Sequence, residues 1–355
     1  MRLVRLLAGA SAALALVAAM VLLPSIPAAG AASGPRWSVT ALRPLHTGET
    51  THVYDVNDVG LSVGLSGSHP VIWAADGTPA ELPTAAGHPN DVPVAINDAG
   101  VIVGIQDATS AIPTRAAIAW VYGQIVPIAA NADAVDVNGS DVVVGCRGGT
   151  DQASRTPFAS AVLIGGPTLT LPTSSSAPGP GGCADSINDW DAVGGFQQAA
   201  SGVTSGRIWY QNHAYDFPDA QQHVNDVRRV GNSGLVLLSI RAANAPTGPV
   251  HAAIATTQGN ELVLDPDATS SVGADMTDYG VVVGTRTTTG NGSGSGPVTE
   301  PMLWAFGSSL PLGTIVGSGD PSLVATSTPT AVSDQLDIVG NEGTTSYVMR
   351  VMPAS

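Results

Sequence analysis

Short apolar runs separated by polar turns recur along the whole chain. The clearest copy spans residues 94–106, where two runs rich in Val and Ile flank the turn Asn97-Asp98-Ala99-Gly100. Asn and Asp side chains accept hydrogen bonds from a turn backbone, and Gly adopts the positive φ that a three- or four-residue hairpin loop needs. Runs that are apolar at nearly every position suit strands covered on both faces. The pattern therefore predicts β-hairpins and no amphipathic helix.

The hairpin is the first half of a repeated unit. It occurs seven times, at spacings of about 40 to 56 residues, and the weakest copy has Gly231 and Leu238 in place of the turn Asn and the closing Gly. A third apolar run follows each hairpin and often ends in Trp, and a short fourth strand such as 124–128 follows a tight turn. We expect these tryptophans to form the core between units: Trp73, Trp120, Trp209 and Trp304.

The two ends of the chain complement one another. The last unit stops after a third strand at 346–352, whereas residues 37–45 resemble a fourth strand with no first three before it. A linear solenoid gains nothing from such ends, but a ring needs them to close. The sequence therefore predicts an all-β fold, a seven-bladed β-propeller of four-stranded blades closed by residues 37–45.

Residues 1–32 have the pattern of a secretory signal peptide. Arg2 and Arg5 precede an uncharged apolar run at 6–23, and Ala29-Gly30-Ala31 fits a cleavage site. A retained membrane anchor is the alternative, because the run is about long enough to span a bilayer. We expect cleavage, a secreted extracellular protein with no membrane span, and a single propeller domain at 33–355.

The units resemble the HAF repeats of bacterial extracellular proteins. That pattern pairs an I-N-x-x-G-x-V-V-G hairpin with an H-A-F-hydrophobic-W strand and an L-G-T-L-G-G-like tail. Residues 96–104 match the first part closely, 69–73 and 251–254 match the second without its Phe, and 312–317 match the tail. The resemblance covers essentially the whole mature chain. It implies an extracellular repeat protein and is silent on activity.

Charge narrows the range of partners. Only 12% of residues are charged, and the formal net charge is −15. All 13 basic residues are Arg, since the chain contains no Lys. A surface of this sign repels nucleic acid and anionic lipid. The seven histidines are scattered, and neither an H-E-x-x-H nor a G-x-S-x-G motif is present. Catalysis is therefore the less favoured expectation.

Two cysteines and three aspartates are candidate site residues. Cys146 and Cys183 form an even pair in an exported chain, and we expect a disulfide that stabilises by about 3–4 kcal/mol in the chain-entropy model. Asp55, Asp136 and Asp275 each lie two residues before a turn, so they face the same way on three innermost strands. They are weak candidates for a Ca²⁺ site in the central channel. The favoured alternative is that they bond backbone groups.

The predicted topology separates two faces. The turns between first and second strands and between third and fourth strands are short and share one face, here called the short-turn face. The other connections share the long-loop face and run at 106–115, 147–157, 172–183, 241–250, 286–301 and 313–328. Variable loops on one face of a rigid scaffold commonly bind partners. The alternative is that these Gly/Ser/Thr/Pro-rich loops are flexible connections with no binding role.

These observations leave three hypotheses for function. The leading one is a monomeric, secreted, non-catalytic scaffold that binds a protein or polysaccharide through the long-loop face. The alternatives are a hydrolase or lyase with its site at the channel mouth, and a purely structural surface component. Trp190 and Tyr279 occupy hairpin tips on the short-turn face. They are possible contact aromatics, or they fold back over the neighbouring blade.

Overall fold

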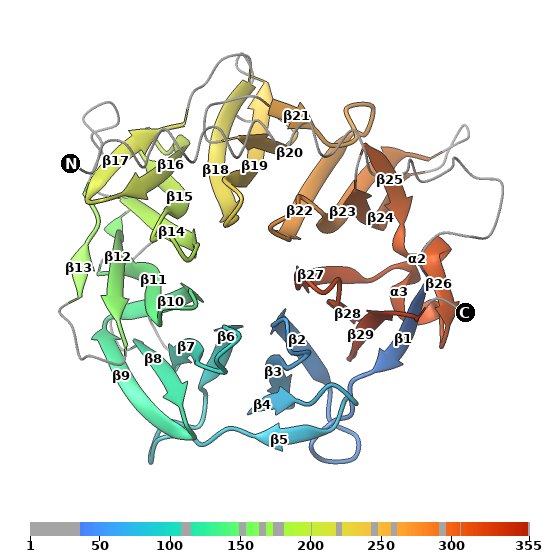
Figure 1. The fold of residues 1–355 in the computed structure, drawn as a ribbon, viewed down its shortest axis with the longest axis horizontal. Coiled ribbons are helices and arrows are strands. Elements are labelled where there is room, and N and C mark those ends of the chain that lie inside the picture. The colour runs from blue at the N-terminus through green and yellow to red at the C-terminus, as the bar shows by residue number, and fades with distance from the viewer. Residues whose placement is uncertain are drawn as a thin grey trace.

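A computed structural model shows seven β-sheets arranged around a central channel (Figure 1). The structure describes residues 36–107, 115–148, 154–162, 168–172, 181–199, 201–217, 222–242, 248–256, 261–290, 296–305 and 307–353. The predicted signal peptide lies outside these residues. Within them, no helix is long and apolar enough to cross a bilayer. The predicted all-β, seven-bladed propeller is confirmed.

Six blades are four-stranded antiparallel sheets whose strands follow one another from the channel outward. Blade 1 contains β2 (Thr51–Val56), β3 (Ser62–Ser66), β4 (His69–Trp73) and β5 (Pro79–Glu81). Blade 2 contains β6 (Val92–Ile96), β7 (Ile102–Gln106), β8 (Ala116–Val121) and β9 (Gln124–Ala130). Blade 3 contains β10 (Ala132–Val137), β11 (Val142–Arg147), β12 (Thr156–Ala161) and β13 (Leu169–Thr170).

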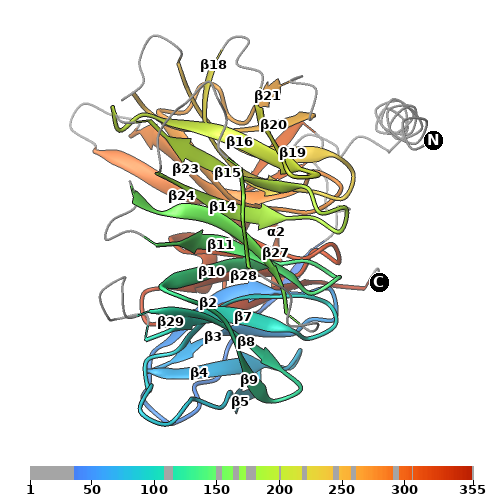
Figure 2. The same ribbon diagram turned by 90° about the vertical axis from the view of Figure 1, so that its left-hand side faces the viewer.

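The second half of the ring repeats this order. Blade 4 contains β14 (Gly181–Ile187), β15 (Val193–Gln198), β16 (Thr204–Tyr210) and β17 (His213–Asp216). Blade 5 contains β18 (Gln222–Val230), β19 (Leu235–Ala242), β20 (His251–Thr256) and β21 (Glu261–Val263). Blade 6 contains β22 (Ser270–Met276), β23 (Val282–Thr289), β24 (Pro297–Ala305) and β25 (Ser308–Pro311). Figure 2 shows the strands running between the two faces of the ring, where the turns gather.

Blade 7 joins the two ends of the chain as predicted. Its order is β27 (Thr328–Val332), β28 (Ile338–Glu342), β29 (Thr345–Val351), β1 (Trp37–Ala41) and β26 (Val316–Ser318). Strand β1 pairs antiparallel with β29, from Trp37 opposite Val351 to Ala41 opposite Tyr347. The strand ends at Ala41 rather than at 45, because the chain then turns to blade 1, where Arg43 N–H donates to Gly77 O at 3.2 Å. The unpredicted β26 pairs with β1 in parallel and adds a fifth strand.

Two predicted long connections are more ordered than expected. Strands β23 and β24 extend into the 286–301 connection, because β-branched Thr287 pairs with Thr299 and Arg286 bonds Glu300 across the ladder at 2.9 Å. The 313–328 connection carries α2 (Leu312–Ile315), β26 and α3 (Ser322–Ala325). Only residues 291–295 of the first connection lie outside the described residues.

The innermost strand of each blade contains a β-bulge. The bulged residue lies three positions before the first residue of the hairpin turn. In β2 the pairing with β3 skips Tyr54, so Asp55 follows Val53 in the register. The closing Gly of the repeat is required here, since a Cβ on Gly64 would collide with the carbonyl oxygen of His52. Blade 5 departs from this rule: Leu238 replaces the Gly, and β18 has two bulges rather than one. Its weak sequence match therefore reflects a real structural difference.

The core lies between blades, as the apolar runs predict. One cluster packs Ala95 and Val103 of blade 2 against Val143 and Phe158 of blade 3. The four strand-ending tryptophans are at most 2% exposed, and each indole N–H donates to the connection that enters its blade, at 2.7 to 2.8 Å. Their acceptors are Arg43 O, Pro83 O, Pro172 O and Asp265 Oδ2. The predicted core role of these tryptophans is confirmed.

Candidate functional site

In four of the seven hairpin turns, the first residue is an Asn that ties two blades together. Asn97 Oδ1 accepts a hydrogen bond from Val101 N–H within its own turn, and Asn97 Nδ2 donates to Asn138 O in the next blade, both at 2.9 Å. Asn57, Asn138 and Asn188 repeat both bonds. A short side chain with both a donor and an acceptor is required for this role. The Asn of the repeat is therefore architectural.

The second turn residues form an inter-blade ring at the channel mouth. In six of seven turns, the backbone N–H donates to the side-chain oxygen of the counterpart in the next blade, at 2.6 to 2.8 Å. The counterparts, here called the Asx ring, are Asp58, Asp98, Gly139, Asp189, Asn232, Asp278 and Asp334. The bond from Asp334 N to Asp58 Oδ1 crosses the closure of the propeller. The ring is interrupted at Gly139, which has no side-chain oxygen.

Gly139→Asn is expected to stabilise the protein by about 0.5–1 kcal/mol, because it supplies the missing acceptor and restricts the unfolded chain. Asn232 already fits the equivalent turn position. A Cβ at Gly139 would lie 2.9 Å from Asp189 Oδ1, which accepts the Gly139 N–H, so this carboxylate must shift slightly while keeping that bond, as the Asp98 carboxylate does beside Asp58. Urea unfolding measures the gain. Gly139→Ala, which adds the Cβ without an acceptor, is the control, and an equal gain in both variants would contradict the added bond.

A second layer of polar side chains lies below the Asx ring, at the position that follows each bulge. Asp55, Asp136 and Asp275 occupy it in blades 1, 3 and 6 and accept hydrogen bonds from backbone N–H groups of the next blade at 2.8 to 3.0 Å. Ser186 does the same in blade 4, from Val230 N–H at 2.9 Å. The alternative expected from the sequence, that these aspartates bond backbone groups, is therefore shown.

The cation among these carboxylates is an arginine that sequence reasoning missed. Arg229 occupies the equivalent position in blade 5, with Nη1 3.1 Å from Asp136 Oδ2 and Nε 3.4 Å from Asp275 Oδ1. The structure thus brings the three candidate aspartates to one channel, around Arg229. A signal was present, since Arg229 lies two residues before Gly231, as Asp55 does before Asn57. The predicted Ca²⁺ remains a prediction, and Arg229 already neutralises part of its site.

Burial and mutual repulsion shift several of these groups. Burial, and then the nearby charge of Asp275, raises the pKa of Asp55 to about 7. Burial raises the pKa of Asp136 despite Arg229, and it raises the pKa of Asp334 in the Asx ring to about 6. Burial alone would lower the pKa of Arg229, but the charges of Asp275, Asp136 and Asp55 raise it. The mouth is therefore rich in negative charge that increases with pH.

The Asx ring and the layer beneath it line one pocket, to which all seven blades contribute. It encloses about 140 Å³, which suits a side-chain terminus or an ion rather than a drug-sized molecule. Eight aspartates and one arginine line it. No histidine is among the described residues around it, so the His–carboxylate convergence required by the enzyme hypothesis is not found at this mouth.

Two exposed aromatic residues directly follow pocket-lining aspartates in hairpin turns of the short-turn face. Trp190 is 68% exposed and Tyr279 is 57% exposed, at the hairpin tips of blades 4 and 6. The indole N–H of Trp190 donates to Asn232 O of blade 5 at 3.3 Å. Trp190 therefore contacts the neighbouring blade while most of its side chain stays exposed, and the contact role of Trp190 and Tyr279 stays a prediction.

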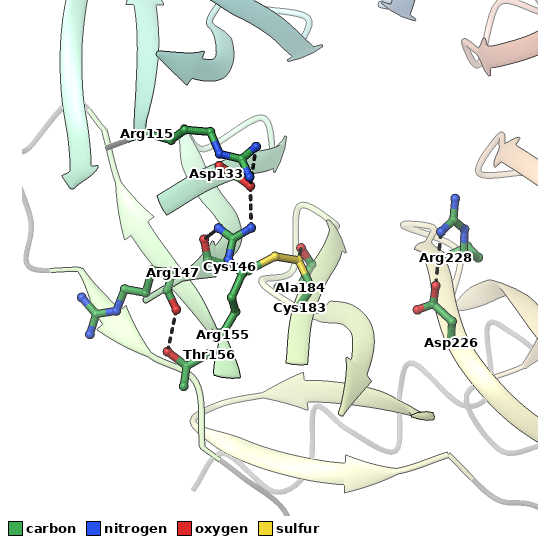
Figure 3. Close-up of a disulfide and its surroundings, with 10 residues drawn as sticks. All are labelled: Arg115, Asp133, Cys146, Arg147, Arg155, Thr156, Cys183, Ala184, Asp226 and Arg228. Atoms are coloured by element: carbon green, nitrogen blue, oxygen red, sulfur yellow. Dashed lines mark hydrogen bonds and ion pairs between the residues drawn. A yellow bond between two sulfur atoms is a disulfide. The ribbon is translucent and has the colours of Figure 1, made fainter. Parts of the chain in front are cut away.

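The disulfide predicted between Cys146 and Cys183 is confirmed on the opposite face. It joins β11 of blade 3 to β14 of blade 4, with a Cα–Cα distance of 4.8 Å. Figure 3 shows Arg115 and Arg155 pointing toward Asp133 beside it; Arg155 also donates to Cys146 O. The neighbouring predicted binding loops fall largely outside the described residues, at 108–114, 149–153, 173–180 and 243–247.

Comparison with known proteins shows the fold and no family. No protein-family model matches the chain, and no curated protein matches it. A catalytically inactive variant of virginiamycin B lyase from Staphylococcus aureus, solved with quinupristin, is 10% identical with a TM-score of 0.50 and covers 89% of this chain and 100% of its own. A streptogramin B lyase is 10% identical with a TM-score of 0.47, covering 89% and 98%. At this identity the similarity concerns the propeller alone.

Proposed function

We propose that this protein is an exported, non-catalytic binding protein that holds a cationic group of a protein partner at the channel mouth of the short-turn face. The observation that carries the proposal is the fixed position of five Asx-ring carboxylates, namely Asp58, Asp98, Asp189, Asp278 and Asp334, around one small pocket. Backbone N–H groups bond most of them, so the negative charge is held in place before a ligand arrives.

A lysine or arginine side chain fits this mouth in size and charge. Its terminus matches the pocket volume, and its charge complements the ring, while Arg229 below limits how far a cation can enter. Trp190 and Tyr279 are exposed and directly follow the pocket-lining Asp189 and Asp278 in the chain, and an aromatic face attracts a guanidinium or ammonium group. Export is supported by the pattern of residues 1–32 and by the resemblance to HAF-repeat extracellular proteins.

Binding of hexa-arginine and hexa-lysine peptides, followed by calorimetry, tests the proposal. Asp98→Asn with Asp189→Asn removes two charges and keeps side-chain oxygens in the Asx ring, as Asn232 shows. We expect at least tenfold weaker binding for this double variant. The matched control is Asp76→Asn with Asp267→Asn, two exposed aspartates away from the mouth. Binding should also weaken from pH 8 to pH 5, because Asp334, with a pKa of about 6, becomes protonated.

Two results would overturn the proposal. One is the absence of binding to either cationic peptide at low salt, where exposed charges attract most strongly. The other is equal binding by the mouth variant and the control variant. Hexa-glutamine, neutral oligosaccharides and Ca²⁺ serve as comparison ligands. Binding of an oligosaccharide that depends on Trp190 and is indifferent to the aspartates would favour a polysaccharide partner instead.

A further inference from the structure

The connection that leaves the closing strand contains a histidine–carboxylate cluster far from the channel pocket. His46 and Glu49 lie between β1 and β2, and His69 begins β4 of blade 1. One nitrogen of each imidazole and one oxygen of Glu49 lie within 4.8 Å of one another. The channel aspartates do not take part in this cluster.

The Glu49 carboxylate is fixed by its other oxygen. Oε2 accepts hydrogen bonds from Ser66 Oγ at 2.6 Å and from the His46 backbone N–H at 3.2 Å. Ser66 is fully buried, and its Oγ is itself held by Leu45 N–H at 2.8 Å. Oε1 is thereby directed at two imidazole nitrogens, 3.5 Å from His46 Nδ1 and 3.6 Å from His69 Nε2.

A second carboxylate fixes the ring of His69. Glu81, at the end of β5, places Oε1 2.9 Å from His69 Nδ1. A carboxylate accepts only, so Nδ1 carries the hydrogen, and in the neutral imidazole Nε2 then has a free lone pair. That lone pair faces Glu49 Oε1, which is also an acceptor, across 3.6 Å. A cation between the two atoms would satisfy both.

These distances suit a metal ion better than direct hydrogen bonds. Ligand atoms at 2.0–2.1 Å from a tetrahedral zinc ion are about 3.3 Å apart, close to the 3.5 and 3.6 Å that separate Glu49 Oε1 from the two imidazole nitrogens. The two nitrogens lie within 4.8 Å of each other, and the exposed His46 side chain can move to bring them closer. A histidine ligand whose other nitrogen donates to a carboxylate is the usual outer-shell arrangement of zinc sites. Two imidazoles and one carboxylate form a donor set for Zn²⁺ and related late first-row ions.

We propose that His46 Nδ1, Glu49 Oε1 and His69 Nε2 bind one Zn²⁺ ion, with Glu81 orienting His69. The side chain of His46 is 61% exposed, so a fourth coordination position faces solvent and takes water. The ion joins the connection after the closing strand to the third strand of blade 1. The ion therefore cross-links two segments of the chain next to the point where its two ends close the ring.

Isothermal titration of the whole chain with Zn²⁺, purified without a histidine tag, tests this site. We expect one equivalent to bind, and a rise in melting temperature of about 4 °C at a hundredfold excess over the dissociation constant. His69→Ala and Glu49→Gln should each weaken binding at least 100-fold. Glu81→Gln should weaken it about 10- to 100-fold while leaving all three ligands in place.

His88→Ala is the matched control. His88 also bonds a carboxylate, that of Asp107, but among the described residues it belongs to no group of three potential metal ligands. This variant should bind Zn²⁺ as the parent does. Urea unfolding without metal shows whether a variant has lost stability for another reason. Co²⁺ supplies a second readout, since a tetrahedral site gives intense visible absorption that His69→Ala should abolish. Substoichiometric Zn²⁺ binding by the parent, or unchanged binding in His69→Ala, would overturn the proposal.

Discussion

Arg229→Met is expected to reduce the free energy of unfolding by about 1–3 kcal/mol at pH 8, because it leaves two largely buried carboxylates without their partner, while the 37% exposure of the Arg229 side chain keeps the cost below that of a fully buried pair. Asp136 and Asp275 both lose their ion-pair partner, and Asp55 loses a nearby positive charge. The methionine side chain roughly preserves volume, so the loss reports charge rather than a cavity. Urea unfolding of parent and variant measures it.

The loss should depend on pH in a defined direction. Without Arg229, the folded pKa values of Asp55 and Asp136, which burial already raises, rise further above their unfolded value near 4. A raised carboxyl pKa stabilises the fold below the unfolded pKa, and this contribution disappears as pH rises through the folded pKa. Because Asp55 already titrates at about 7 in the parent, the difference between parent and Arg229→Met should be smaller at pH 5.5 than at pH 8.

Two further variants separate this explanation from a general effect of losing an arginine. Arg43→Met breaks the exposed pair with Asp76, whose side chains are 60% and 69% exposed, and should leave the urea concentration at mid-unfolding nearly unchanged, because solvent screens an exposed pair. Adding Asp136→Asn and Asp275→Asn to Arg229→Met removes the uncompensated charges and should restore most of the lost stability. If Arg229→Met unfolds at the same urea concentration as Arg43→Met, the channel ion pairs have no structural importance.

The architecture was predictable because it depends on features that repeat along the chain. Hairpin turns such as Asn97-Asp98-Ala99-Gly100 locate the first two strands of a blade, and a Trp such as Trp120 marks the third. A ring follows once the last unit lacks the strand that residues 37–45 supply. The Cys146–Cys183 disulfide could be predicted for the same reason, since the order of strands within adjacent units places both cysteines.

The candidate sites depend on geometry that the repeat does not encode. Arg229 occupies the channel position that Asp55 occupies in blade 1, two residues before the turn, but its contact with the Asp136 carboxylate, 93 residues away, depends on the arrangement of blades around the channel. His46, Glu49 and His69 meet because one irregular connection folds against blade 1. The repeat therefore places Arg229 in the channel, whereas no period or motif brings the two histidines and Glu49 together. A repeat pattern identifies strands and turns, whereas departures from it place the side chains with chemistry.

Trp37→Ala is expected to reduce the free energy of unfolding by about 3–5 kcal/mol, the range for deleting a large buried aromatic side chain. Trp37 is 3% exposed in the core between blades 6 and 7, and its indole N–H donates to Leu336 O at 3.1 Å. It is also the first residue of the closing strand, opposite Val351. The substitution therefore weakens the core and the closure of the ring together, which urea unfolding will register.

The control distinguishes closure from the general loss of an indole. Trp190→Ala removes a tryptophan that is 68% exposed, so it should change stability by less than about 1 kcal/mol.

Limited proteolysis locates the effect of Trp37→Ala. If the closing strand detaches first, cleavage in the connection at 42–50 should accelerate in this variant before other segments are cut. A closed ring has no free sheet edge in blade 7 at β29, and only the pairing of β1 with β29 provides this. Cleavage that begins elsewhere, with 42–50 still protected, would mean that the propeller does not open at the junction of its two chain ends.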